Sequence, residues 1–353
     1  MIIGTCGFGS TGSSVITDYL LEYNSFSHMD RLEFTWVFNV DGLIDLEYHL
    51  MNPHQRAADS IVAIKRYRDM VKRELRLYTK SGRIKKKDLL ACVDEFLSKL
   101  VQVKWRWENP AASTFFEIYF KHYLLGHKVI PWLEKRKKRK LNPFFFDEVS
   151  LSVCPNNFYD AARTHVKDML RLLGLDTTKS IVLDQPFSGN NPQACFPFFD
   201  DPYAIVVDRD PRDVYIFSKT ALLGKNHYIP NDNVKDFVVY YRAIRDGQPY
   251  TKDDDRVMRI KFEDLVYNYD SSTERIRKFL GLGDNPRPKS IFDPSLSVAN
   301  TRLYERFPKF TDDVKYIEEH CKEYLYDFSK YPSPKGELKM FYGKSPLNKG
   351  GSL

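Results

Sequence analysis

Short apolar runs alternate with amphipathic stretches along much of the chain. Five runs have the length and composition of buried strands. Because each is separated from the next by residues with helical spacing, the pattern predicts an α/β protein with a parallel sheet flanked by helices. The predicted strands are Ile2–Cys6, Phe34–Phe38, Ser180–Leu183, Tyr203–Val207 and Arg256–Ile260.

Helices are predicted where apolar residues recur every three or four positions. One expected helix covers Ser13–Tyr23, and others follow Gly42, cover Asn156–Leu173 and end at Gly281. Residues 54–142 are more charged and repeatedly helical in period. We therefore expect one domain over residues 1–353, with 54–142 as an insertion of three or four helices.

Composition narrows the class of protein. The 353 residues carry a formal net charge of +7, a mild excess that suits an anionic ligand or a generally basic surface. The five cysteines form no CxxC pair, so we expect reduced thiols and no metal site. We expect no leader before the first strand, and no apolar run approaches the ~20 residues of a membrane helix. We expect a cytoplasmic protein, with room for a peripheral membrane contact.

The insertion ends in a strongly basic run, Glu134–Lys140. Such a run is typical of a solvated helix end, and it also fits an acidic substrate or a membrane surface. It is short and lacks interleaved aromatic residues, so we expect no nucleic-acid partner.

A Gly/Ser/Thr loop, Gly7–Ser14, follows the first predicted strand and precedes a helix. Glycines let the backbone turn sharply and approach an anion closely, and the N–H groups of such a loop converge on one spot. The spacing is that of a P-loop, but Ser13 stands where the lysine of nucleotide hydrolases belongs. An ordinary strand-to-helix turn is the alternative.

A second stretch, Arg209–Val214, follows the strand that ends at Val207. An arginine at the carboxyl end of a strand reaches the crevice where α/β proteins bind ligands, and Pro211 fits the first turn of a helix. Ser218, deeper in that helix, could add a hydroxyl. The alternative is that Arg209 only pairs with Asp213 or Asp184.

These stretches together resemble the sulfotransferase superfamily, most nearly its bacterial members. The resemblance spans about residues 1–50 and 175–330. Its motifs are Ser10–Ser14, Arg209–Val214, Phe262–Leu265 and Phe279–Leu282.

The resemblance implies a donor, 3′-phosphoadenosine 5′-phosphosulfate (PAPS), and an acceptor hydroxyl on a glycan, glycolipid or small alcohol. The loop would hold the 5′ end of PAPS, and Arg209 the 3′-phosphate. Phe262, in place of the usual tyrosine, would flank the adenine. The implied donor-binding residues are Gly9, Thr11, Gly12, Ser13, Ser14, Arg209, Ser218, Phe262, Asn300 and Arg302.

The resemblance also implies a base and a cation. Glu33 is the preferred base, and His28, Asp41 and His49 are its rivals. The loop cation of the family falls on Ser10, which cannot neutralise charge. Lys219 is the first candidate to replace it. Further candidates are Arg212, Lys225 and His227, and Asp184 and Gln185 are expected near the acceptor or the sulfate.

Two other functions fit the loop. A nucleotide-dependent kinase would need the missing lysine. A catalytically inactive nucleotide-binding or partner-binding protein of the same fold would not need a cation at position 10.

Overall fold

The computed structural model describes residues 1–52, 57–80, 84–107, 127–138, 147–220, 228–246 and 254–334. By its internal contacts the chain divides into two compact units. The first contains Met1–Thr35 and Leu175–Leu353, and the second contains Trp36–Gly174. The 54–142 segment lies within the second unit.

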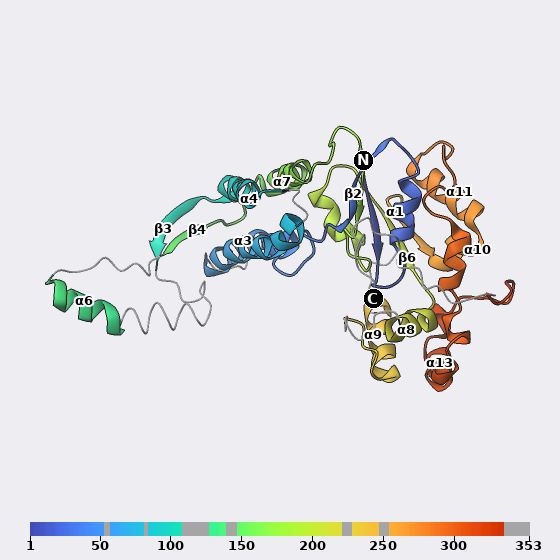
Figure 1. Ribbon diagram of the computed structural model, residues 1–353. Coiled ribbons are helices and arrows are strands. Elements are labelled where there is room, and N and C mark those ends of the chain that lie inside the picture. The colour runs from blue at the N-terminus through green and yellow to red at the C-terminus, as the bar shows by residue number, and fades with distance from the viewer. Residues whose placement is uncertain are drawn as a thin grey trace. The chain divides into compact units, whose positions relative to one another are not determined.

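A five-stranded parallel sheet forms the centre of the first unit (Figure 1). Its strand order is β2-β5-β1-β6-β7, and every neighbouring pair runs parallel. The central strands are apolar along their length because helices and loops cover both faces. This confirms the predicted α/β class. The strands are β1 (Ile2–Gly7), β2 (Phe26–Glu33), β5 (Ser180–Asp184), β6 (Pro202–Asp208) and β7 (Val257–Lys261).

Three helices pack against one face of this sheet. They are α1 (Ser14–Leu20), α10 (Phe262–Tyr267) and α11 (Tyr269–Leu280). The cluster that they form with the strands includes Ile3, Ile16, Tyr19, Val182, Ile205, Val207, Ile260, Leu265 and Ile276. Gly281, at φ +65°, ends α11 in the left-handed conformation, as the sequence predicted.

A second cluster joins α8 (Pro211–Thr220), α9 (Val234–Asp246) and α13 (Thr311–His320). It includes Val214, Tyr215, Phe237, Tyr241, Val314 and Ile317. The short helices of this unit are η3 (Pro192–Phe198), α12 (Pro294–Ser297), η4 (Val298–Asn300), η5 (Leu303–Glu305), η6 (Pro308–Phe310) and η7 (Lys322–Tyr324).

The second unit is mainly helical. Its helices are α2 (Leu43–Met51), α3 (Ala57–Lys80), α4 (Lys86–Leu100), α6 (Ile130–Lys137) and α7 (Phe158–Leu172). An antiparallel hairpin of β3 (Val103–Trp107) and β4 (Asp147–Leu151) was not predicted. Its strands are separated by residues 108–146, so the sequence contains no short turn motif that would predict the hairpin. No described helix is long and apolar enough to cross a membrane.

The predicted strand at Phe34–Phe38 is wrong. The strand of this region, β2, is the more polar segment before it and ends at Glu33. The Phe34 N–H still donates to the Asp184 carbonyl at 2.8 Å, and the chain then turns. Phe34, Trp36 and Val37 are buried, so their apolar pattern reflects the core and not a strand.

Candidate functional site

The carboxyl ends of the parallel strands lie side by side at one edge of the sheet. Strand β1 runs into the glycine loop, Gly7–Ser14, and β6 ends just before Arg209. On the other side of the loop β5 ends at Asp184, whose register partner on β2 is Glu33. The order across the edge is therefore Glu33, Asp184, the glycine loop and Arg209. The structure brings together residues predicted from four separate stretches.

The glycine loop turns through two left-handed positions. Gly9 and Gly12 have φ values of +81° and +85°. A Cβ would lie 2.6 Å from the Tyr228 ring at Gly9 and 2.7 Å from the Phe262 ring at Gly12. Within the described residues, the backbone N–H groups of Gly9–Ser13 have no hydrogen-bond acceptor. They are donors that an anion can use.

The hydroxyls of the loop have different surroundings. Thr11 is buried, and its Oγ1 accepts the N–H of Phe8 at 3.2 Å. Ser13 is also buried, and its Oγ accepts from Nε2 of Gln185 at 2.8 Å. Ser14 begins α1 and is exposed. Thr11 thus fixes the shape of the loop. The hydroxyls of Ser13 and Ser14, at the start of α1, can still donate a hydrogen bond to a ligand.

Gln185 holds the glycine loop in place through two side-chain hydrogen bonds. Besides its bond to Ser13, its Oε1 accepts the N–H of Gly7 at 3.3 Å. Its backbone has φ +52°, a conformation that a non-glycine residue holds only when its contacts demand it. The sequence predicted Gln185 at the acceptor or sulfate, and the structure gives it this further contact with both ends of the loop.

Ser10 stands at the tip of the loop with φ +56°. Its Oγ lies 2.7 Å from the hydroxyl of Tyr228. Tyr228 was not found from the sequence, because its position so far from the loop in the chain carries no motif. The pair puts two hydroxyls at the tip of the loop.

Arg209 is the buried cation of this edge. Its side chain is enclosed, with 3% of the residue exposed, between the rings of Phe217 and Phe262 at 5.4 and 5.1 Å. Nη1 donates to the carbonyl of Ser10 at 3.1 Å, and Nη2 donates to the carbonyl of Asn300. Its Nε is buried and has no partner in the described part of the chain. A charged group with an unused donor thus lies against the glycine loop.

Buried carboxylates surround Arg209. Asp210, Asp213 and Glu263 are each 0% exposed. The Asp210 carboxylate accepts a hydrogen bond from Nη2 of Arg212 at 2.8 Å, and the Asp210 N–H donates to Oε1 of Glu263 at 2.9 Å. Burial raises the pKa of Asp213, although the charge of Arg209 opposes this. Burial, helped by the charges of Asp210 and Asp213, raises the pKa of Glu263 to about 8.

We expect Glu263 to make the protein less stable as the pH rises. Its pKa is raised in the folded state, so between about pH 5 and 8 the native protein binds a proton that the unfolded chain has released. The free energy of unfolding should then fall with pH by up to about 1.4 kcal/mol per unit. Urea unfolding across this range should show the fall, and Glu263→Gln should make it less steep, leaving the part that Asp213 contributes. An equal slope in both proteins would contradict the assignment.

Two residues of α8 predicted near the donor lie elsewhere. Ser218 Oγ donates to the Tyr215 carbonyl of its own helix at 2.7 Å. Phe217, one position earlier, faces Arg209 instead, as the ~100° step of a helix requires. Lys219 Nζ lies 3.5 Å from the Asp232 carbonyl and over the Tyr215 ring, with no hydrogen bond to the loop among the described residues.

The carboxyl-terminal segment closes one side of the Arg209 site. Asn300 is buried and accepts from Arg209 through its carbonyl. Arg302 is in the left-handed conformation at φ +52° and donates its N–H to Asp213 at 2.8 Å. Its guanidinium is engaged by Glu305 and by the Tyr331 carbonyl. The backbone of this segment, more than its side chains, meets the site.

Glu33 and Asp184 form the acidic side of the edge. Burial raises the pKa of Glu33. Asp184 is buried and accepts weakly from the Thr5 hydroxyl at 3.4 Å. Glu33 is exposed, so a substrate can reach it, and a carboxylate with a raised pKa is suited to take a proton.

The remaining candidates make other contacts, belong to the second unit or fall outside the described residues. His28 is exposed in the middle of β2, paired with Val182. Asp41 and His49 belong to the second unit, where Asp41 forms ion pairs with Arg66 and Arg73. Arg212 is engaged by Asp210 and Glu318. The last two candidates, Lys225 and His227, fall outside the described residues.

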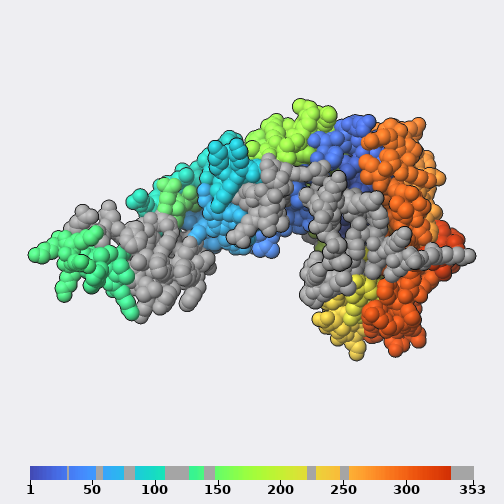
Figure 2. All heavy atoms as spheres, viewed as in Figure 1, coloured from blue at the N-terminus to red at the C-terminus, as the bar shows by residue number. Residues whose placement is uncertain are grey.

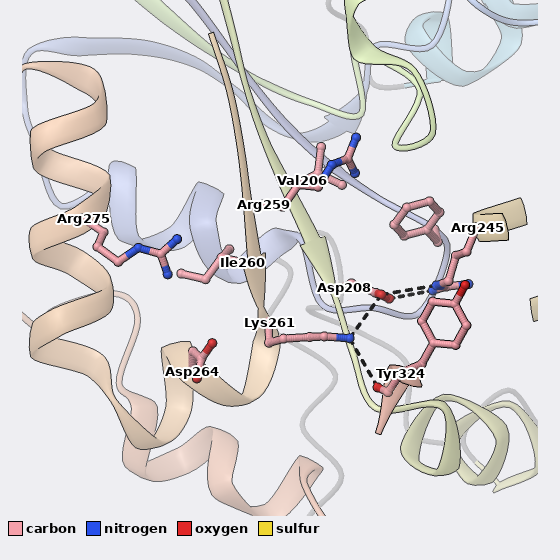
Figure 3. A pocket seen from close by; sticks show the side chains of 10 residues that line it. Val206, Asp208, Arg245, Arg259, Ile260, Lys261, Asp264, Arg275 and Tyr324 are labelled. Atoms are coloured by element: carbon pink, nitrogen blue, oxygen red, sulfur yellow. Dashed lines mark hydrogen bonds and ion pairs between the residues drawn. The ribbon is translucent and has the colours of Figure 1, made fainter. Parts of the chain in front are cut away.

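A cavity of about 430 Å³ lies beside the ends of β6 and β7 (Figure 3). In this cavity the Asp208 carboxylate accepts hydrogen bonds from Nη2 of Arg245 at 2.6 Å and from Nζ of Lys261 at 3.3 Å. Burial alone would raise the pKa of Asp208, but the two cations outweigh it and hold the pKa below its ordinary value. Phe8 of the glycine loop also lines the cavity and stacks on Arg245 at 4.3 Å. This ion-paired cluster supports the loop from the side away from Gln185.

Comparison with known proteins finds matches among solved structures alone. No family model and no curated protein matches the chain. The sulfotransferase domain of the Synechococcus PCC 7002 olefin synthase is similar at 15% identity and TM-score 0.36, over 86% of this chain and 88% of that one.

Two further structures are similar over comparable lengths. A retinol dehydratase in complex with androsterone and the inactive cofactor PAP has 13% identity and TM-score 0.36, over 92% and 81% of the two chains. The sulfotransferase STF1 from Mycobacterium tuberculosis H37Rv has 12% identity and TM-score 0.32, over 86% and 76%. Likenesses at this level of sequence identity and TM-score decide nothing about function.

Proposed function

We propose that the protein is a sulfotransferase that moves a sulfuryl group from PAPS to an acceptor hydroxyl. The observation that carries the proposal is the buried guanidinium of Arg209, donating to the Ser10 carbonyl with its Nε unused, beside a loop whose N–H groups lack acceptors. Loop donors and a buried arginine at one strand edge suit a ligand with two separate anionic groups.

The donor set fits PAPS residue by residue. The N–H groups of Gly9–Ser13 would hold the 5′-phosphosulfate, and the spaces at Gly9 and Gly12 admit no side chain. Arg209 would bind the 3′-phosphate through charge-assisted hydrogen bonds. The ring of Phe262, which lies over both Gly12 and Arg209, would flank the adenine.

The chemistry requires little more than positioning. In PAPS the sulfuryl group is bonded to a phosphate oxygen; the acceptor oxygen attacks the sulfur as that bond breaks, and the acceptor proton must leave. Glu33 would take the proton, since it lies at the same strand edge with a pKa raised by burial. The N–H groups of the loop would stabilise the charge that develops on the leaving phosphate.

The missing lysine at position 13 separates this proposal from the kinase, whereas turnover separates it from the inactive binding protein. Position 13, where a kinase needs lysine, is a serine held by Gln185. At position 10 the hydroxyls of Ser10 and Tyr228 are the polar groups available. An inactive binding protein would share the cradle for PAPS but would not transfer its sulfuryl group.

Turnover with labelled donors tests these readings against one another. The protein is incubated with sulfur-labelled PAPS, or with γ-labelled ATP and magnesium, and a panel of sugars, glycolipids and small alcohols. Transfer of sulfur label to an acceptor supports the proposal. Transfer of phosphate label, or none from either donor while PAPS binds, would favour the kinase or the inactive binder.

Glu33→Gln should reduce turnover by about 10²- to 10⁴-fold, because a glutamine cannot accept the acceptor proton. Affinity for the donor should stay within a few-fold. The wild-type rate should rise with pH through a pKa above the ordinary carboxylate range, and this rising arm should be missing in the variant. If Glu33→Gln keeps full turnover, the base is another residue, and Asp184→Asn is the next variant.

A further inference from the structure

Three of the four tryptophans are exposed, and all three belong to one stretch of the second unit. Trp105 and Trp107 on β3 are 37% and 39% exposed, and Trp132 on α6 is 57% exposed. The fourth, Trp36, is buried at 1%. Exposing large aromatic rings to water forgoes much favourable burial, so three exposed rings in one stretch of the chain indicate a region that binds a partner.

The hairpin separates its rings from its cations. All five residues of β3 are exposed, and Trp105 and Trp107 stack with ring centroids 6.3 Å apart. They lie on one face of the strand, because side chains two positions apart point the same way. Lys104 and Arg106 lie on the opposite face, where Lys104 is 3.7 Å from Glu148.

Helix α6 combines an exposed ring with a basic end. Figure 2 shows α6, drawn in green, at the surface. Val129 and Trp132 are exposed, and the guanidinium of Arg136 lies over the Trp132 ring at 5.4 Å. The helix ends in exposed cations: Lys135, Arg136, Lys137 and the following Lys138.

We propose that β3 and α6, the two elements that carry these exposed rings, dock on an anionic lipid bilayer. Tryptophan is the side chain best suited to the boundary between headgroups and acyl chains, since its ring is apolar and its N–H is polar. The basic end of α6 complements anionic headgroups. A single-stranded nucleic acid fits less well, because a base stacked on Trp105 or Trp107 would have the strand's cations behind it, on the other face.

This inference does not depend on the proposed transferase activity. It concerns the second unit, whereas the donor site consists of residues of the first. Donor binding and bilayer binding can therefore fail separately. Where both hold, the acceptor hydroxyl would belong to a lipid headgroup or to a glycan attached to a lipid.

Vesicle sedimentation with the full chain tests the docking. We expect binding to phosphatidylcholine vesicles that contain phosphatidylserine, and at least ~10-fold weaker binding to vesicles of phosphatidylcholine alone or at high salt. Tryptophan emission should shift to shorter wavelength on binding. No binding to the anionic vesicles, equal binding to both kinds, or tighter binding to single-stranded DNA would overturn the proposal.

Matched variants assign the binding to these residues. Lys135→Glu/Arg136→Glu/Lys137→Glu should weaken vesicle binding at least ~10-fold. The control Lys235→Glu/Lys278→Glu/Lys315→Glu makes the same change of net charge at exposed residues of other helices and should retain binding. Trp105→Ser/Trp107→Ser should also lose binding, whereas Tyr48→Ser, which removes an exposed ring from α2, should not. Equal losses in variant and control would contradict the assignment.

Discussion

Arg209→Ala should lower the affinity for adenosine 3′,5′-bisphosphate by at least about 30-fold. The substitution removes a buried guanidinium that would make charge-assisted bonds to the 3′-phosphate, and such losses typically reach 2–5 kcal/mol. Affinity for adenosine 5′-monophosphate, which has no 3′-phosphate, should change little. Isothermal titration calorimetry with both nucleotides measures the difference.

The substitution also leaves the carbonyls of Ser10 and Asn300 without their donor, so a loss of stability must be separated from a loss of recognition. Arg287→Ala is the control: Arg287 likewise donates to two backbone carbonyls, those of Leu21 and Glu22, at the opposite end of α1 from the loop. Its variant should keep nucleotide affinity. If Arg209→Ala binds both nucleotides like the wild type, Arg209 is only a structural residue.

Gly12→Ala should abolish nucleotide binding and destabilise the fold. A Cβ at this position would lie 2.7 Å from the buried Phe262 ring, and φ is +85°, where alanine is strained. The loop or Phe262 must then shift, and the N–H donors of the cradle shift with it. We expect a loss of about 1–3 kcal/mol from the strained backbone, with a further loss from the clash. Thermal or urea unfolding and the same titration measure both effects.

Gly174→Ala separates backbone strain from the clash. Gly174 has nearly the same φ, +87°, but a Cβ there meets nothing within 4 Å. It follows α7, in the second unit. This variant should show the backbone cost alone and should bind nucleotide normally. Equal stability losses in the two variants, with binding intact in both, would show that the Gly12 position has no special role.

The sequence predicts most of the sheet because strands that are buried on both faces are recognisable as short apolar runs. The runs that became β1, β5, β6 and β7 are short and mostly apolar, with Arg259 as the one charged residue inside a run. β2 lacks this signal, since an edge strand tolerates polar side chains, and the buried aromatic residues that follow it imitate a strand. The β3–β4 hairpin was missed because its partners are separated by residues 108–146.

For the site, the sequence identifies residues that carry motifs and misses those that act through contacts. The glycine loop and Arg209 were both predicted, and the strand order places them at one edge. Tyr228 could not be found, because its contact with Ser10 joins positions 218 residues apart. Ser218 and Phe217 show the limit of spacing arguments: one step along a helix decides which side chain faces Arg209.

One titration tests the central claim, that this edge of the sheet binds a 3′-phosphorylated nucleotide without metal. Adenosine 3′,5′-bisphosphate is titrated into the wild-type protein in the presence of EDTA, and ATP with magnesium is titrated separately. We expect tight binding of the bisphosphate, and binding of magnesium-ATP that is weaker by at least about 100-fold. Preference for magnesium-ATP, or binding of neither nucleotide, would contradict it and leave the glycine loop as a turn between strand and helix.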